Sequence, residues 1–274
     1  MSEIVVYLPF AVILLVIGAG AGVLAGLLGV GGGIVLVPAY FYAFSALGFG
    51  GDQLMQVCVA TSLATIIVTS LRSVQSHNRK GAVDWKILRA WAPGIAIGAV
   101  LGLLVASRVS SGVLQGVFGA AGLAVGLYMA LGRSNWQLAT SLPGGAGRAG
   151  VSSGLGFLSV LMGIGGGTFG VPIMTLCAVP IHRAVATAAG FGLIIALPSA
   201  IGFLFLNLPE GAAPPLTIGA VNLPAFALTI AMTLVTTPLG AKLAHAMDPG
   251  PLKRVFGGFL ILVALNMLGS LVWG

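Results

Sequence analysis

The sequence predicts an all-helical polytopic membrane protein made of two related halves, and three observations support this. The 274-residue chain is 58% hydrophobic and only 6% charged, with a mean hydropathy of +1.12. A soluble domain of this size cannot cover its surface with so few charges. Long apolar segments alternate with short polar connections. A glycine-proline pattern near the start of the chain recurs about halfway along.

The recurring pattern runs from Gly29 to Pro38 and again from Gly163 to Pro172, with a run of glycines before each proline. Glycine weakens a helix and lets the backbone bend. In a membrane, a broken helix is tolerated only where it faces protein or a wet cavity. Two such breaks at matching places in two half-chains indicate the binding site of a transporter.

The apolar segments divide the chain into a first membrane repeat (1–132), a Gly/Ser/Pro-rich linker (133–150) and a second membrane repeat (151–274). In the first repeat we expect apolar segments over about 5–28, 34–49, 54–76, 87–106 and 112–131. In the second repeat we expect them over about 151–162, 168–181, 183–206, 218–241 and 251–273. Two glycine ladders of small-xxx-small spacing predict close helix packing, at Gly18, Gly22 and Gly26 and at Gly94, Gly98 and Gly102.

Short matching stretches relate the two halves and indicate an internal duplication. The aligned stretches are Gly33–Pro38 with Gly167–Pro172, Gln56–Thr61 with His182–Thr187, and Gly81–Asp84 with Gly219–Asn222. Asp84 and Asn222 thus occupy equivalent positions, and we expect both to be helix N-caps.

Charge favours inverted over parallel repeats. The apolar legs at 151–162 and 168–181 are about 18–21 Å long at about 1.5 Å per residue, too short for a hydrocarbon core of about 30 Å. If each glycine segment is a re-entrant hairpin followed by three transmembrane helices, every Lys and Arg except Arg108 lies on the inner side. The alternative, eight spans in parallel 4+4 repeats, distributes the Lys and Arg residues more evenly between the two sides of the membrane.

The glycine-proline repeats are accompanied by Ala60-Thr61-Ser62 in the first half and by His182 with Ala186-Thr187 in the second. With these features, the sequence resembles the TauE/SafE family of sulfite and organosulfonate transporters. The resemblance covers nearly the whole chain. It implies a multi-pass permease of the bacterial cytoplasmic (inner) membrane for small sulfur-containing anions such as sulfite, thiosulfate or sulfoacetate-like sulfonates. The second Ala-Thr element continues with Ala188, so a hydroxyl present in the first half is missing there.

The residue chemistry agrees with an anion as cargo. Helix N-termini that follow the glycines offer free N–H groups and the positive end of a dipole, and nearby hydroxyls add donors. The candidate substrate-binding residues are Gly31, Gly32, Gly33, Gln56, Thr61, Ser62, Gly165, Gly166, Gly167, Thr168, His182 and Thr187. His182 is a candidate for proton coupling or substrate contact.

Other functions remain as alternatives or are disfavoured. A passive anion channel would use the same glycine tips, and a cation-coupled carrier of an unrelated solute would place Asp or Glu within a span. Gly150-Val151-Ser152-Ser153-Gly154 spells a nucleophile motif but opens a membrane segment, so we expect no enzyme. No P-loop follows the glycines, and the cysteines and histidines are scattered, so we expect no cofactor, no metal and no disulfide. The net charge of +7 indicates membrane orientation rather than a nucleic-acid partner.

Overall fold

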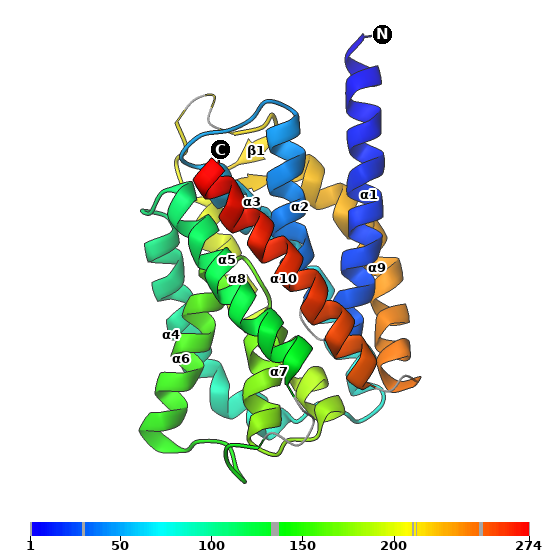
Figure 1. The fold of residues 1–274 in the computed structure, drawn as a ribbon, viewed down its shortest axis with the longest axis vertical. Helices are drawn as coiled ribbons and strands as arrows, with labels where there is room; N and C mark the ends of the chain where they lie inside the picture. Colours follow the sequence, from blue (N-terminus) through cyan, green and yellow to red (C-terminus); the bar gives the residue numbers. More distant parts are fainter. Residues whose placement is uncertain are drawn as a thin grey trace.

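The computed structural model describes residues 2–28, 31–132, 137–209, 211, 213–246 and 249–273, and this part of the chain is mostly helical (Figure 1). The first-half helices are α1 (Ser2–Leu28), α2 (Gly33–Ala46), α3 (Leu54–Asn78), α4 (Trp85–Ala106) and α5 (Ser111–Leu131). The second-half helices are α6 (Gly145–Leu161), α7 (Gly167–Leu176), α8 (Ile181–Leu204), α9 (Leu223–Ala246) and α10 (Pro249–Trp273). By length and composition, α3, α4, α5, α8 and most of α9 can cross a membrane, so the all-α membrane class is confirmed.

Two local features differ from the sequence expectation. Helix α6 begins at Gly145, inside the stretch expected to be a linker, although glycine disfavours a helix. Its contact with α4 reaches back to Ala149, whose carbonyl oxygen would lie 3.3 Å from a Cβ on Gly94, and the helix continues for about one mostly exposed turn before it. A short antiparallel hairpin of β1 (Thr217–Ile218) and β2 (Val221–Asn222) precedes α9, in a register that pairs Thr217 with Asn222. This hairpin delays the start of α9 relative to the expected apolar segment.

The predicted N-caps at Asp84 and Asn222 are confirmed. The Asp84 carboxylate accepts hydrogen bonds from the N–H groups of Lys86 and Ile87, at 3.0 and 3.1 Å. The Asn222 side-chain oxygen accepts one from the N–H of Ala225, at 3.0 Å. Both caps satisfy donors that the first turn of a helix leaves free, and they fix where the fourth helix of each half begins.

The helices of the two halves pack against each other in exchanged pairs. Helix α1 lies along α9, whereas α6 lies along α4, so the first helix of each half packs on the fourth helix of the other. Helices α5 and α10 pack together, and α3 contacts α8. In Figure 1, α5 and α10 cross the front of the molecule side by side. Helices α3 and α8 are the most buried candidate spans and form the centre of the bundle.

The two glycine ladders lie at these exchanged contacts, as predicted. Gly18, Gly22 and Gly26 of α1 face α9, where a Cβ on Gly18 would lie 2.9 Å from the Thr229 Cα. Gly94, Gly98 and Gly102 of α4 face α6 in the same way. Absent side chains therefore let the backbones approach closely, which is the usual way for helices to associate in lipid.

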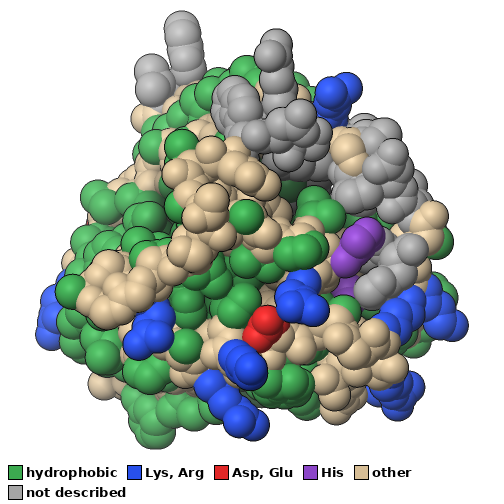
Figure 2. Space-filling model, turned by 90° about the horizontal axis from the view of Figure 1, so that it is seen from below, with side chains coloured by type: hydrophobic (Ala, Val, Ile, Leu, Met, Phe, Trp, Pro, Cys, Tyr) green, Lys and Arg blue, Asp and Glu red, His purple; other side chains and the backbone are tan. Residues whose placement is uncertain are grey.

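Basic side chains gather at one end of the bundle. The connection from α3 to α4 and the starts of α6, α8 and α10 lie at the bottom of Figure 1, and Figure 2 shows Lys and Arg spread over that face. The exposed bases at these helix ends are Arg79, Lys80, Lys86, Arg89, Arg183, Lys242 and Arg254. The connection from α4 to α5, which contains Arg108, lies toward the opposite end of the bundle in Figure 1.

Candidate functional site at the glycine tips

The two glycine segments meet inside the protein. We call residues 31–33 the first tip and residues 163–167 the second tip; Gly29 and Val30 lie outside the described residues. A Cβ on Gly31 would lie 3.5 Å from the Gly165 Cα, and one on Gly33 would lie 2.8 Å from the Ile164 Cα. Residues 31–34 and 161–168 are all buried. The structure therefore brings the starts of α2 and α7 together in the protein interior.

The backbone of both tips depends on glycine. Gly31 and Gly32 have φ angles of +74° and +79°, and Gly163 has +64°, a region that residues with a side chain rarely adopt. Gly32 is the N-cap of α2, and its carbonyl accepts hydrogen bonds from the N–H groups of Val35 and Leu36. Because Gly31 and Gly33 on either side are also glycines, no side chain of the first tip covers the start of α2.

Gly166, the N-cap of α7, needs glycine because of its surroundings. A Cβ there would overlap the Cβ of Phe191 and lie 2.9 Å from the nitrogen of Gly192. Both neighbours belong to α8, so α8 packs directly on the turn that begins α7. A larger residue at this position would separate the second tip from the centre of the bundle.

Helix α3 holds both tips with side-chain hydroxyls. Ser62 donates a hydrogen bond to the Gly163 carbonyl at 2.7 Å, and Thr69 donates one to the Gly31 carbonyl at 3.0 Å. Ser62 was among the residues expected from the sequence, whereas Thr69 was not. Thr69 carries no local signal, because only the folded path of α1 and α2 brings Gly31 beside it.

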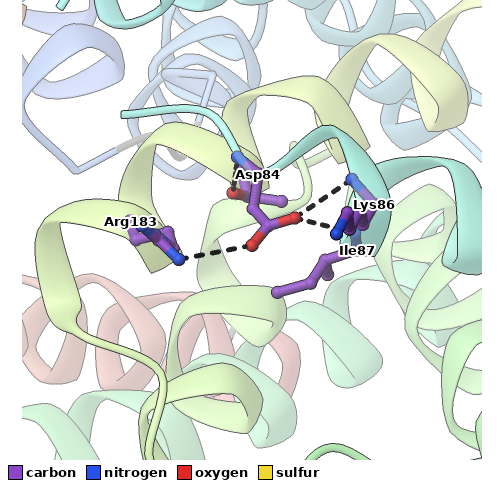
Figure 3. Close-up of polar contacts among 5 residues, drawn as sticks. Asp84, Lys86, Ile87 and Arg183 are labelled. Atoms are coloured by element: carbon purple, nitrogen blue, oxygen red, sulfur yellow. Dashed lines mark hydrogen bonds and ion pairs between the residues drawn. The ribbon is translucent and has the colours of Figure 1, made fainter. Parts of the chain in front are cut away.

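Thr61 and Thr187 hold the opposing half rather than the tips. The Thr61 hydroxyl accepts a hydrogen bond from the Asn222 N–H, and the Thr187 hydroxyl accepts one from the Asp84 N–H, both at 2.9 Å. Figure 3 shows the second contact together with the Asp84 cap and its ion pair with Arg183, whose charged atoms lie 3.6 Å apart. The aligned threonines therefore make aligned contacts with the two aligned caps.

Gln56 and His182 lie at the starts of α3 and α8, before the turns that carry the tip contacts. Gln56 is buried and donates hydrogen bonds to the carbonyls of Ala106 and Val109 in the connection from α4 to α5. His182 is exposed in the first turn of α8, next to Arg183 on the basic face. The structure therefore brings the tip glycines, Ser62 and Thr168 together and places Gln56 and His182 elsewhere.

A model of the sulfite exporter TauE/SafE family matches residues 14–267. The chain belongs to the TauE/SafE family. A probable membrane transporter protein of Haemophilus influenzae is 31% identical over 94% of this chain and 98% of its own length. Proteins with the same description from Methanocaldococcus jannaschii and Bacillus subtilis are 29% and 27% identical, over 97% and 94% of this chain and 97% of each relative. No solved structure matches. The protein is a multi-pass membrane transporter of this family.

In this TauE/SafE protein, aligned positions on and around the hairpin helices α2 and α7 carry different side chains in the two halves. In the first, the buried Tyr40 hydroxyl of α2 hydrogen-bonds the hydroxyls of Thr229 and Thr65, at 2.8 and 3.4 Å. The repeat alignment pairs these three residues with Met174, Trp91 and Phe191. Trp91 and Phe191 stack with ring centroids 5.8 Å apart, and all three are buried. The repeats therefore share a backbone plan but not a side-chain chemistry.

Thr168 lies in the first turn of α7 and is buried, and its hydroxyl has no hydrogen-bond partner. Among the described residues, six buried side chains carry such an atom: Gln53, Ser70, Ser73, Ser159, Thr168 and Thr237. Most polar groups buried in proteins are hydrogen-bonded, so a free hydroxyl at the start of a helix in a transporter needs an explanation.

Proposed function

We propose that this TauE/SafE protein is a secondary transporter that moves small sulfur-containing anions, such as sulfite, thiosulfate or sulfonates, across the bacterial cytoplasmic membrane. The observation that carries the proposal is the meeting of the two glycine tips, which places the starts of α2 and α7 together in the buried interior. The family supplies the substrate class, and the tips supply a site of suitable chemistry.

The start of a helix attracts an anion through its free N–H groups and the positive end of its dipole. Each helix start stabilises a negative charge by about 0.3–1 kcal/mol when exposed and by up to about 2 kcal/mol when partly buried. The tip glycines leave these donors uncovered by side chains of the turn. A site made from dipoles holds an anion without a fixed ion pair, which favours release on the far side of the membrane.

The distribution of charged side chains also favours an anion. Among residues whose side chains the structure describes, the carboxylates are Asp52, in an exposed connection, and Asp84, at the N-cap of α4. Neither lies within a candidate span, where a cation-coupled carrier would place its acidic ligand. The described part of the chain therefore favours negative cargo over positive.

We also propose that the halves are inverted repeats, each with a re-entrant glycine hairpin and three transmembrane helices. The exchanged packing of α1 on α9 and α6 on α4 supports this, as does the pairing of Thr61 with Asn222 and Thr187 with Asp84. In Figure 1, α1 runs down from the N-terminus, whereas α6 runs up from the bottom. The basic bottom face would be cytoplasmic.

Alternating exposure of the tip site would carry the anion across. Export from a negative-inside cell is driven by the membrane potential, at about 2.3 kcal/mol per charge per 100 mV. Import of the same anion would require a second driving force such as coupled protons.

A thermal-shift panel on detergent-purified protein tests the substrate class. Sulfite, thiosulfate, sulfoacetate, taurine, sulfate and chloride are each added over a concentration series, because a ligand that binds only the folded state raises the melting temperature. We expect a saturable shift with at least one sulfur anion, lost in Gly166→Leu and kept in Gly154→Leu, where a Cβ would meet no atom within 4 Å. Equal shifts with sulfate and chloride, or none with any anion, would contradict the proposal.

A further inference from the structure

The two tips are not equivalent in their surroundings. The repeat alignment pairs Ile34 with Thr168, in the first turns of α2 and α7, and pairs Ile66 of α3 with Gly192 of α8. At the first tip, a Cβ on Gly31 would lie 3.1 Å from the Ile66 side chain, and one on Gly33 would lie 2.8 Å from it. The start of α2 is therefore covered by aliphatic groups.

At the second tip, a hydroxyl from the other half takes the place of that aliphatic cover. Gly192 has no side chain, and a Cβ added to it would overlap the hydroxyl oxygen of Ser70 from α3. The same Cβ would lie 3.5 Å from the backbone nitrogen of Gly166, the N-cap of α7. The Ser70 hydroxyl and the Gly166 nitrogen therefore both lie beside Gly192, close to the start of α7.

The hydroxyls at the second tip are buried and have no partner. Ser70 and Thr168 are each 1% exposed, and neither hydroxyl oxygen has a hydrogen-bond partner among the described residues. An unsatisfied buried polar group costs about 1–3 kcal/mol. The N–H groups in the first turn of α7 also lack partners within the helix. A bound oxyanion would accept hydrogen bonds from all of these donors.

We propose that the second tip alone holds the anion, with the Ser70 and Thr168 hydroxyls and the N–H groups at the start of α7 as donors. The first tip closes the site with Ile34 and Ile66. This assignment rests on the proposed function, anion transport. It restricts the binding site to the second tip, so that each chain binds one anion. It also adds Ser70, which lies in the half opposite to α7, to the binding residues.

The donors also indicate the charge of the ligand. Hydroxyls and backbone N–H groups are neutral, and no Lys or Arg lies within the described parts of α2 or α7 or the tips. The desolvation cost of a buried ion rises with the square of its charge, and none of the donor groups named here carries a positive charge to offset it. The site therefore takes a singly charged oxyanion, such as a sulfonate or hydrogensulfite, in preference to a dianion such as sulfate.

Isothermal titration of the full-length protein in detergent tests this proposal, with methanesulfonate as the singly charged probe and sulfate as the dianion. We expect one methanesulfonate per chain and weaker sulfate binding. Ser70→Ala and the near-isosteric Thr168→Val should each weaken methanesulfonate binding about 10- to 100-fold. The reason is that a hydrogen bond to a charged group contributes more free energy than one between neutral groups. Ser73→Ala is the matched control, because Ser73 lies on the same helix and is also a buried hydroxyl without a partner.

Melting temperatures without ligand show which variants are folded, and the two donor variants test the site independently. If Ser70→Ala and Thr168→Val bind methanesulfonate as tightly as the wild type does, the assignment to the second tip is overturned. Two anions per chain, or equal affinity for sulfate, would also overturn it. If the wild type binds no sulfur oxyanion at all, the proposed function itself fails.

Discussion

At the residue scale, the most informative contacts are those of Thr61 and Thr187. Each threonine accepts a hydrogen bond from the backbone N–H of the residue that caps the fourth helix of the other half. The contacts are repeat-related, but their surroundings differ. Asn222 is buried, whereas Asp84 is partly exposed and pairs with Arg183. The Thr61 contact therefore protects a donor that has no access to water.

We predict that Thr61→Val lowers the free energy of unfolding by about 1–3 kcal/mol, because it leaves the buried Asn222 N–H unpaired. Thr187→Val should cost less, since the Asp84 N–H is near solvent. Thr236→Val is the control, because the Thr236 hydroxyl bonds only the Met232 carbonyl of its own helix. Denaturation followed by circular dichroism in detergent measures the differences. Equal stability for all three variants would show that the cross-half contact is not stabilising.

At the element scale, each glycine hairpin has its own construction. Helix α1 has 27 residues, about 40 Å at about 1.5 Å per residue, and α6 has 17, about 26 Å. The first leg of the first hairpin is thus much longer than the first leg of the second. The tips meet even though the legs differ, because α3 bonds both tips through Ser62 and Thr69.

The features that could be predicted from the sequence are those that depend only on neighbouring residues in the chain. The glycine breaks, the caps at Asp84 and Asn222 and the glycine ladders follow from residue type and spacing, and the structure confirms them. The sequence expectation placed the start of this segment near residue 151, whereas α6 begins at Gly145, because a glycine-rich stretch carries no local signal for a helix. In Figure 1, α6 crosses in front of α4, and the two helices pack together.

The candidate site was predicted only in part. The tip glycines and Thr168 have a sequence signal, since the repeat marks them. Ser70 and Thr69 do not, because they reach the tips from the middle of α3 only after folding. The aligned pairs Ile34 with Thr168 and Ile66 with Gly192 distinguish the two tips in the sequence, but their meaning depends on which side chains pack around each glycine.

At the scale of the whole molecule, the exchanged packing constrains how the transporter moves. Helix α1 is bound to α9, and α6 to α4, so neither half of the sequence is a separate body. A rigid unit therefore combines helices from both halves. The basic face in Figure 2 predicts that this end of the units faces the cytoplasm.

Labelling of single cysteines tests inverted against parallel repeats. In a background without Cys58 and Cys177, we expect Ser110→Cys and Asn207→Cys to react with a membrane-impermeant maleimide in intact cells. Lys80→Cys and His182→Cys should react only after permeabilisation. All four positions are exposed. In eight parallel spans, positions 110 and 207 lie on opposite sides of the membrane, so opposite labelling of that pair would contradict the inverted arrangement.

The most direct test of anion transport through the glycine tips is flux into proteoliposomes. With purified protein and an imposed potential, positive inside, we measure uptake of radiolabelled sulfite by the wild type, Gly166→Leu and the control Gly154→Leu. We predict saturable uptake that follows the potential, is lost in Gly166→Leu and is retained in Gly154→Leu. Equal uptake by Gly166→Leu and the wild type would contradict transport through the tips, and no uptake by a folded wild type would contradict sulfite as cargo.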